Sequence, residues 1–262
     1  TRRNVRKNLR NGVKAIKIAA TGGVTDAKEI GQAGTPEMTE ANMRIICEEA
    51  HNAGILVAAH AQSSAGILAA LRAGVDTIEH GSAMSDEVKA LFKDNPNALR
   101  GHSAVIPTLM ACLPLVKLDV KVTGANDISK ANAVMIMDEM LAGIADALDN
   151  DIELGMGTDS ALTFVTHYNT WREIDFLIRY GNVPAARALH AATQGNARIL
   201  GIDAETGSIE PGKAADLILT AANPLEEIRT LDKPIAVCVR GSLIDAPSVE
   251  RFAQIDELLD AF

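Results

Sequence analysis

Four short apolar runs in this chain each end in, or lead directly into, a residue of a type that occurs in metal sites. The runs are VKAIKIAATGG, ILVAAHAQS, VDTIEHGS and IELGMGTDS, and the residues are Lys17, His60, His80 and Asp159. Parallel strands that are buried on both faces have continuous apolar sequences of this kind. In a barrel of such strands the catalytic groups lie at the carboxyl ends. We therefore expect the four residues to share one rim of a parallel sheet.

Helix-like and strand-like patterns alternate along most of the chain, which is typical of an α/β fold. Helices are expected at 2–11, from Thr39 as a cap to about 53, and at 64–73, 85–93, 127–149, 168–180 and 184–200. Strands are expected at 13–18, 55–59, 75–78, 104–109 and 152–156. After Gly201 only short β-like runs follow, at 216–220 and 234–240. This pattern predicts a barrel domain over 1–205 and a smaller β domain over 206–262.

Composition excludes several classes of partner. The net charge is -9 and aromatic residues make up 3% of the 262 residues, so neither a basic surface nor many aromatic rings are present to bind nucleic acid. No run approaches the roughly 18 apolar residues that a membrane helix needs, so no membrane partner is expected. The three cysteines lack metal-ligand spacing and are expected to be buried free thiols.

The residue types at the strand ends indicate a metal site. Two imidazoles, a carboxylate and a lysine suit zinc or a similar divalent ion. Each residue also has an ordinary alternative: a lone histidine can be a hydrogen-bonded core residue, Lys17 can extend from a strand end into water, and Asp159 can cap a helix. Two histidines at successive strand ends favour the metal site.

Longer blocks of sequence resemble a known family. The blocks are IKIAATGGV, AHNAGILVAAHAQSSAGILAALRAGVDTIEHG, GMGTDS and GSIEPGKAADLILTAANPLEEI. They resemble the amidohydrolase superfamily of metal-dependent hydrolases, over about residues 5 to 245. Within it they are most similar to the branch of zinc-dependent Xaa-Arg, Xaa-Lys and Xaa-Pro dipeptidases (prolidase-like) and imidazolonepropionase-like proteins. The resemblance implies a TIM (β/α)8 barrel, with strands four to eight in this chain, and a small β-sandwich built partly from the C-terminal segment.

The resemblance also implies roles for the four residues. Lys17 corresponds to a lysine that becomes carboxylated and bridges two Zn²⁺ ions. His60 and His80 correspond to the ligands of the second ion. Asp159 corresponds to the aspartate that contacts the first ion and acts as the general base. His167 lies in a segment that resembles the pocket-lining loop of the family and is expected to contact the substrate. Apart from the resemblance, Gly22 and Gly23 are expected to let the substrate approach the backbone, and residues 110–126, which mix apolar residues with Pro114 and Gly124, are expected to form a cover over the site.

One family feature does not occur in this sequence. The first barrel strand of the family carries an HxH pair for the first metal, and no HxH is present in the 262 residues. We expect that pair, and three further strands, to lie in an N-terminal part that precedes Thr1. We also expect a homo-oligomer in the cytoplasm.

These observations predict a metal-dependent amidohydrolase. The expected activity is that of a dipeptidase or carboxypeptidase that uses metal-activated water on a small peptide or N-acyl amino acid. One alternative is hydrolysis of a cyclic amide, as by imidazolonepropionase, or of a lactone. Another is a non-catalytic relative that serves binding or assembly, for which the missing HxH pair is the argument.

Overall fold

The computed structural model describes all residues from 1 to 262, and these form two compact units. The first consists of Thr1–Pro107 and Asp119–Leu154, and the second of Thr108–Leu118 and Gly155–Phe262. Each unit is described by itself. These units do not follow the boundary expected between 205 and 206, which stays a prediction.

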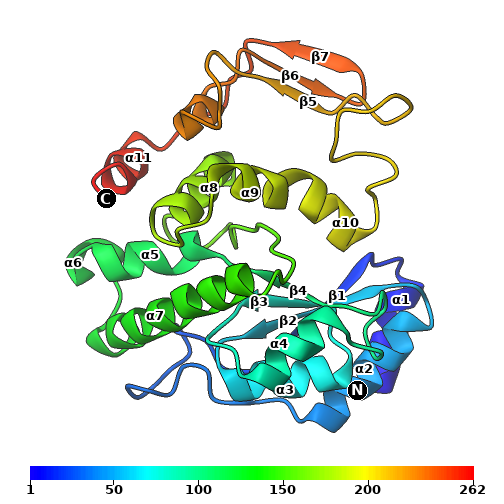
Figure 1. Cartoon of the computed structure of the whole chain (residues 1–262). Helices are drawn as coiled ribbons and strands as arrows, with labels where there is room; N and C mark the ends of the chain where they lie inside the picture. Colours follow the sequence, from blue (N-terminus) through cyan, green and yellow to red (C-terminus); the bar gives the residue numbers. More distant parts are fainter. The chain divides into compact units, whose positions relative to one another are not determined.

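A four-stranded parallel sheet is the centre of the first unit (Figure 1). Its strands are β1 (Ala15–Ala19), β2 (Leu56–Ala61), β3 (Thr77–His80) and β4 (Ala104–Ile106), in that order. The strands hydrogen-bond as β1 with β2, β2 with β3 and β3 with β4, all parallel. The α/β class with a parallel sheet is thereby confirmed.

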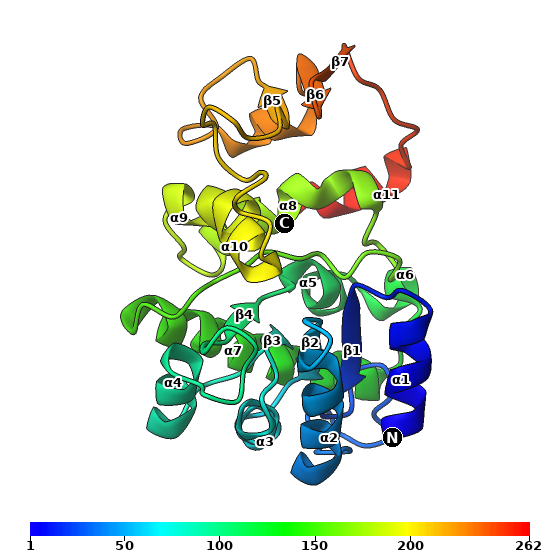
Figure 2. The same ribbon diagram turned by 90° about the vertical axis from the view of Figure 1, so that its right-hand side faces the viewer.

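The helices of the first unit follow from the amphipathic patterns of the sequence. They are α1 (Arg2–Arg10), α2 (Glu40–His51), α3 (Ser64–Ala73), α4 (Asp86–Lys93), α6 (Val120–Thr123) and α7 (Asp127–Asp149). In Figure 2 the helices α4, α3, α2 and α1 stand in a row, in the same order as the strands β4 to β1. Polar side chains cap five of the helices by accepting a backbone N–H, as expected at helix N-termini. These caps are Thr39, Ser63, Ser85, Asp119 and Asn126.

The two faces of the sheet differ in burial. Along β1 and β2 the exposed fraction alternates, so that Ile16, Ile18, Val57 and Ala59 are buried while Lys17 and its neighbours on the other face are not. The helix-facing side of the sheet is therefore the apolar core. The expectation that these strands are buried on both faces is wrong for β1 and β2 in this chain, because their second face carries Lys17 and the partly exposed His60.

The fifth expected strand is much shorter than predicted. Residues 152–156 form only one isolated parallel bridge, between Leu154 and Val105 of β4. Val105 N also donates to the carbonyl oxygen of Glu153 (3.1 Å). The fourth strand ends at Ile106, directly before Pro107, because proline has no N–H to continue the sheet. The direction and neighbour of the fifth segment were predicted correctly, but its length was not.

Helices make up the first half of the second unit. They are α5 (Leu109–Lys117), the 3-10 turn η1 (His167–Asn169), α8 (Thr170–Arg179), α9 (Ala185–His190), the π-helical turn η2 (Ala191–Gly195) and α10 (Asn196–Leu200). The buried carboxylate of Glu173 on α8 accepts the backbone N–H of Leu109 (2.8 Å) and of Met110 (2.7 Å). This carboxylate satisfies the first donors of α5 and joins the two helices.

A small antiparallel sheet and a short helix complete the second unit. The sheet contains β5 (Leu217–Leu219), β6 (Ala236–Val239) and β7 (Ser242–Asp245), in that order, with the 3-10 turn η3 (Ile228–Asp232) between β5 and β6. The helix is α11 (Ala253–Leu259). Residues of both faces of the sheet are exposed in β5 and β7. No helix in the chain combines the length and the apolar character required to cross a bilayer.

Candidate metal centre

The two predicted histidine ligands of the first unit lie in contact with each other. His60 is near the end of β2 and His80 is the last residue of β3, the adjacent strand. Their imidazole ring centroids are 4.5 Å apart, and the ring planes are inclined by 70°. Two imidazoles from successive strand ends thus lie in contact, and their role as ligands of a common metal ion stays a prediction.

An unusual backbone conformation at His80 accompanies this contact. In the sheet register His80 pairs with Ala61, whereas His60 pairs with Glu79. Simple alternation along the strands would therefore place the two histidines on opposite faces. His80 instead has a φ of +72°, which is uncommon for a residue other than glycine, and Gly81 follows with a φ of +87°. The backbone leaves the strand conformation at the residue whose ring meets His60.

His80 is held in the uncharged form that can bind a metal. The side chain is buried. Burial, and to a lesser extent the charges of His60 and Lys17, keep the pKa of the His80 imidazole well below its ordinary value. A metal-binding imidazole must be neutral at the ligating nitrogen. The environment of His80 therefore favours the state that a ligand requires.

Lys17 lies on the same face of the sheet as Glu79, with which it forms an ion pair. Its Nζ is 3.9 Å from Glu79 Oε2, and its side chain is 51% exposed. Thr77 Oγ1 donates to the other carboxylate oxygen of Glu79 (2.7 Å). An ammonium group has no lone pair to offer a metal. Lys17 could therefore act as a ligand only after carboxylation, and its half-exposed position leaves the amine accessible for that reaction.

Glu79 is a site residue that the sequence analysis did not single out. It directly precedes His80 in VDTIEHGS, and its register partner in β2 is His60. A carboxylate at the end of a buried apolar run was the available signal. Glu79 on β3 reaches Lys17 on β1 across the intervening strand β2.

The histidines of this unit are of a type that binds divalent metals, but too few ligand side chains lie close together to complete a metal site. Nowhere in the chain do three or more histidine, cysteine, aspartate or glutamate side chains lie close enough to hold a metal ion. His60 and His80 are borderline ligands of the kind that bind zinc. The described geometry thus supplies a pair of imidazoles with Lys17 and Glu79 on the same sheet.

The expected substrate-contact glycines lie beside His60. The carbonyl oxygen of Gly22 is 3.4 Å from His60 Nε2. A Cβ atom added to Gly23 would lie 3.4 Å from His60 Cε1 and 3.6 Å from Nε2. These distances are ordinary van der Waals contacts, so the backbone at position 23 lies directly beside the imidazole. Whether either glycine contacts a substrate stays a prediction.

Asp159 belongs to the second unit and lies in a tightly folded loop. It is exposed and has a φ of +55°, and Ala161 and Phe164 in the same loop also have positive φ values. Ala161 N donates to the carbonyl oxygen of Val165 (3.2 Å), which closes the loop. The next helical turn starts at His167, with Thr166 as its N-cap. Asp159 therefore does not cap a helix, and its catalytic role stays a prediction.

His167 starts the turn η1 and is exposed. It lines a largely apolar hollow of about 390 Å³ in the second unit, together with Tyr168, Val249 and Phe252. The hydroxyl of Tyr168 accepts the backbone N–H of Phe252 (2.8 Å), so this tyrosine joins the two segments that form the hollow. An exposed imidazole at such a hollow is available to a small molecule, and substrate contact by His167 stays a prediction.

Comparisons with known proteins show which family and which solved structures the chain resembles. Residues 1–244 match the sequence profile of a family described as the amidohydrolase family. A solved structure of a Bifidobacterium longum protein provisionally named a prolidase is 52% identical, with a TM-score of 0.94, over 99% of this chain and 62% of that one. A Xaa-Pro dipeptidase with methionine bound in its active site is 29% identical, with a TM-score of 0.80, over 93% of this chain and 57% of that one.

A curated relative comes from a fungus. The ochratoxinase of Aspergillus niger is 30% identical over 237 residues, which are 90% of this chain and 46% of the ochratoxinase. The chain therefore spans about half the length of this relative and 57 to 62% of the two solved structures.

Proposed function

Since the chain belongs to the amidohydrolase family, we propose that it forms the metal-binding part of an enzyme that hydrolyses an amide or peptide bond of a small substrate. The observation that carries this proposal is the contact between His60 and His80 at the ends of adjacent parallel strands. A buried neutral imidazole beside a second imidazole is chemistry suited to a divalent metal. A hydrolase that uses metal-activated water needs such ligands.

The proposed substrate is a dipeptide or an N-acyl amino acid, cleaved as by a dipeptidase or carboxypeptidase. Two of the similar solved structures are named as prolidase or Xaa-Pro dipeptidase, which supports an Xaa-Pro dipeptide as the first substrate to test. The relatives are longer than this chain, and we assign the activity to the complete protein.

For the fold we propose the (β/α)8 barrel of the family. The strands β1 to β4, followed by the segment at Leu154, run parallel and in sequential order, as successive barrel strands do. They would be the fourth to the eighth strands. The three-stranded sheet β5–β7 would be the C-terminal part of a small β-sandwich, which agrees with the exposed apolar side chains on both of its faces.

Each site residue receives a role in the proposed reaction. His60 and His80 would hold one of two zinc ions, and Lys17, once carboxylated, would supply oxygen ligands between the two. The metal would lower the pKa of a water molecule and polarise the scissile carbonyl. Asp159 would accept the proton of that water and transfer it to the leaving amine. Gly22, Gly23 and His167 would contact the substrate.

The test is to measure metal content and hydrolysis of Xaa-Pro dipeptides in the complete protein, before and after replacing one proposed ligand. His80→Ala is expected to lose metal and to reduce the hydrolysis rate by more than about 100-fold, since even partners of ligands contribute 10- to 100-fold. His102→Ala is a matched control, because His102 is exposed and precedes β4, at the opposite end of the sheet.

Three outcomes distinguish the proposal from its alternatives. Loss of metal and of dipeptide hydrolysis in His80→Ala alone supports a metal-dependent dipeptidase. Metal binding with hydrolysis only of cyclic amides or lactones would assign a different substrate. A protein that binds no metal and hydrolyses nothing, even with zinc and bicarbonate supplied, would contradict the enzyme and leave a binding or assembly role.

A further inference from the structure

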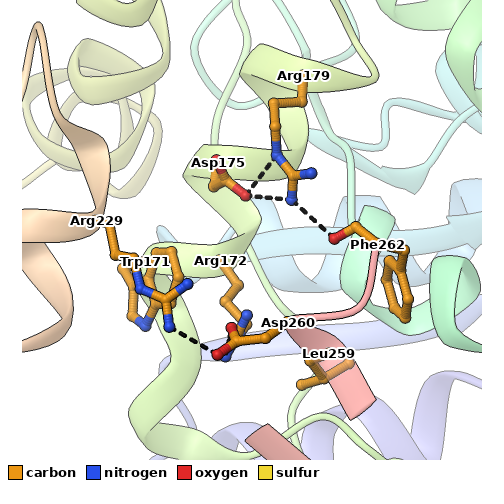
Figure 3. A pocket seen from close by; sticks show the side chains of 8 residues that line it. All are labelled: Trp171, Arg172, Asp175, Arg179, Arg229, Leu259, Asp260 and Phe262. Atoms are coloured by element: carbon orange, nitrogen blue, oxygen red, sulfur yellow. Dashed lines mark hydrogen bonds and ion pairs between the residues drawn. The ribbon is translucent and has the colours of Figure 1, made fainter. Parts of the chain in front are cut away.

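The second unit contains a pocket that the proposed hydrolysis does not use. It has a volume of about 210 Å³ and lies between α8, the turn η3 and the C-terminal segment that includes the end of α11 (Figure 3). Charged groups dominate its lining. The polar residues and the tryptophan that line it are Trp171, Arg172, Asp175, Arg179, Arg229 and Asp260.

Three buried side-chain nitrogens of residues that line this pocket have no hydrogen-bond partner, namely Trp171 Nε1, Arg172 Nε and Arg172 Nη2, of which Nη2 forms only an ion pair. Arg172 is 2% exposed and Trp171 is 5% exposed. The Nε atom of Arg172 and the indole Nε1 of Trp171 both lack an acceptor in the protein. Leaving a buried donor without an acceptor costs about 1 to 3 kcal/mol, and native proteins rarely tolerate it. The pocket is therefore lined by donors that require an acceptor.

Among the residues that line the pocket, three arginines stand against two aspartates, so the lining itself carries one positive charge in excess, which favours an acceptor that is an anion. Asp260 alone serves two of the arginines, since its Oδ1 is 2.7 Å from Arg172 Nη2 and its Oδ2 is 2.7 Å from Arg229 Nη2.

The nearest other carboxylate is committed elsewhere. Asp256 lies 3.8 Å from Arg172 Nη2, at the limit of an ion pair. Its oxygens accept hydrogen bonds from Asn169 Nδ2 (2.8 Å) and from Arg251 Nε (2.9 Å). Asp256 already accepts these two hydrogen bonds, and at 3.8 Å it is too far from Arg172 Nη2 to form a hydrogen bond with it. The unmet donors are left for a molecule from solution.

We propose that this pocket binds a small oxyanion, a phosphate or a carboxylate, through Arg172, Arg229 and the indole N–H of Trp171. Guanidinium groups present several N–H donors in a planar arrangement that matches both kinds of anion. Arg229 is 57% exposed, so the pocket is open to solvent on that side. Bound there, the anion joins α8 to η3 and to the C-terminal segment.

Trp171 offers a direct measurement because it is the only tryptophan of the chain. Inorganic phosphate and, separately, acetate are titrated into the protein in a phosphate-free buffer at constant ionic strength while tryptophan fluorescence is recorded. Sodium chloride alone is the reference titration. We expect a saturable change in fluorescence with at least one of the two anions, absent with chloride, and a rise in Tm at saturation.

A pair of variants locates the binding. Arg229→Gln removes an exposed cation of the pocket, so the fold is expected to survive, and binding should weaken at least tenfold. Arg240→Gln removes another exposed arginine of the same unit that does not line the pocket, and it should leave the affinity unchanged. Circular dichroism checks that both variants are folded.

The outcomes separate clearly. A response to phosphate alone identifies phosphate chemistry, a response to acetate alone identifies a carboxylate, and a response to both identifies a general oxyanion site. No saturable response, or equal affinities in the two variants, would overturn the proposal. None of these readouts uses hydrolysis, so the result is independent of the proposed enzymatic function.

Discussion

Two histidines from neighbouring strands meet because the backbone at position 80 leaves the strand conformation. The sequence placed His60 and His80 at strand ends, which is what the apolar runs before them indicate. It did not indicate the positive φ of His80, since this conformation is uncommon for histidine. Nor did it indicate the ion pair between Lys17 on β1 and Glu79 on β3, two strands along the sheet. Residue types could be read from the sequence, whereas side-chain directions could not.

Glu173 provides a prediction about pH. Burial raises the pKa of its carboxyl group to about 8, although the backbone N–H groups of Met110 and Leu109 act in the opposite direction. In the unfolded chain the pKa is near its ordinary value of 4.5. Between these two values the folded state holds a proton that the unfolded state has released. The contribution of Glu173 to stability is therefore largest below pH 4.5 and falls as the pH rises to about 8.

The measurement compares the free energy of unfolding of the original protein with that of Glu173→Gln at several pH values from 5 to 9. Relative to Glu173→Gln, the free energy of unfolding of the original protein should fall by up to about 1.4 kcal/mol per pH unit as the pH rises. This decrease should level off above about pH 8. Glu250→Gln, an exposed carboxylate of the same unit, should show no such slope. Parallel pH profiles for the original protein and Glu173→Gln would show that the expectation is wrong.

At the scale of elements, helices with long apolar stripes were predicted most accurately. The helix expected over 127–149 is α7 (Asp127–Asp149), and the helix expected over 64–73 is α3. The segment 110–126, expected as a cover, contains most of α5 and all of α6. Proline within α5 obscured its helical pattern in the sequence. The carboxylate of Glu173, far along the chain, supplies the acceptor for the start of this helix.

The packing of α7 depends on a glycine. A Cβ atom added to Gly143 would lie 2.5 Å from the backbone oxygen of Ser82, too close for any real side chain. Gly143→Ala should therefore destabilise the protein by about 1 to 2 kcal/mol, because the cost of overpacking exceeds the helix propensity that alanine adds. Thermal and urea unfolding measure the change.

Ala142→Gly is the matched control on the exposed side of the same helix. It should cost about 1 kcal/mol through helix propensity alone. If Gly143→Ala were instead more stable than the original protein, the close approach of α7 to Ser82 would be refuted.

For the whole molecule, the family resemblance drawn from the sequence blocks is confirmed, including the similarity to prolidase-like members. The parallel sheet is also confirmed. Closure of a barrel, the β-sandwich, the cytoplasmic location and the homo-oligomer stay predictions.

In the 262-residue chain by itself, self-association is expected to involve the small sheet β5–β7, because the apolar side chains that the proposed β-sandwich would cover are exposed there and large apolar surfaces favour association. Leu243 of β7 is 71% exposed. Replacing it by serine should shift analytical ultracentrifugation profiles toward the monomer. Leu200→Ser, at an exposed leucine of α10 in the same unit, should leave the profile unchanged. A chain that is monomeric throughout would exclude association through this sheet.

The sequence by itself determined the order of strands and helices, the parallel sheet and the residue types at the strand ends, because these follow from local apolar periodicity and from short-range capping. Only the tertiary structure decided which side chains meet. It placed Glu79 beside Lys17 and turned His80 towards His60. It also brought Arg229 to the buried donors of Trp171 and Arg172. Such contacts join residues that are distant in the chain, and they arise from packing that no local pattern encodes.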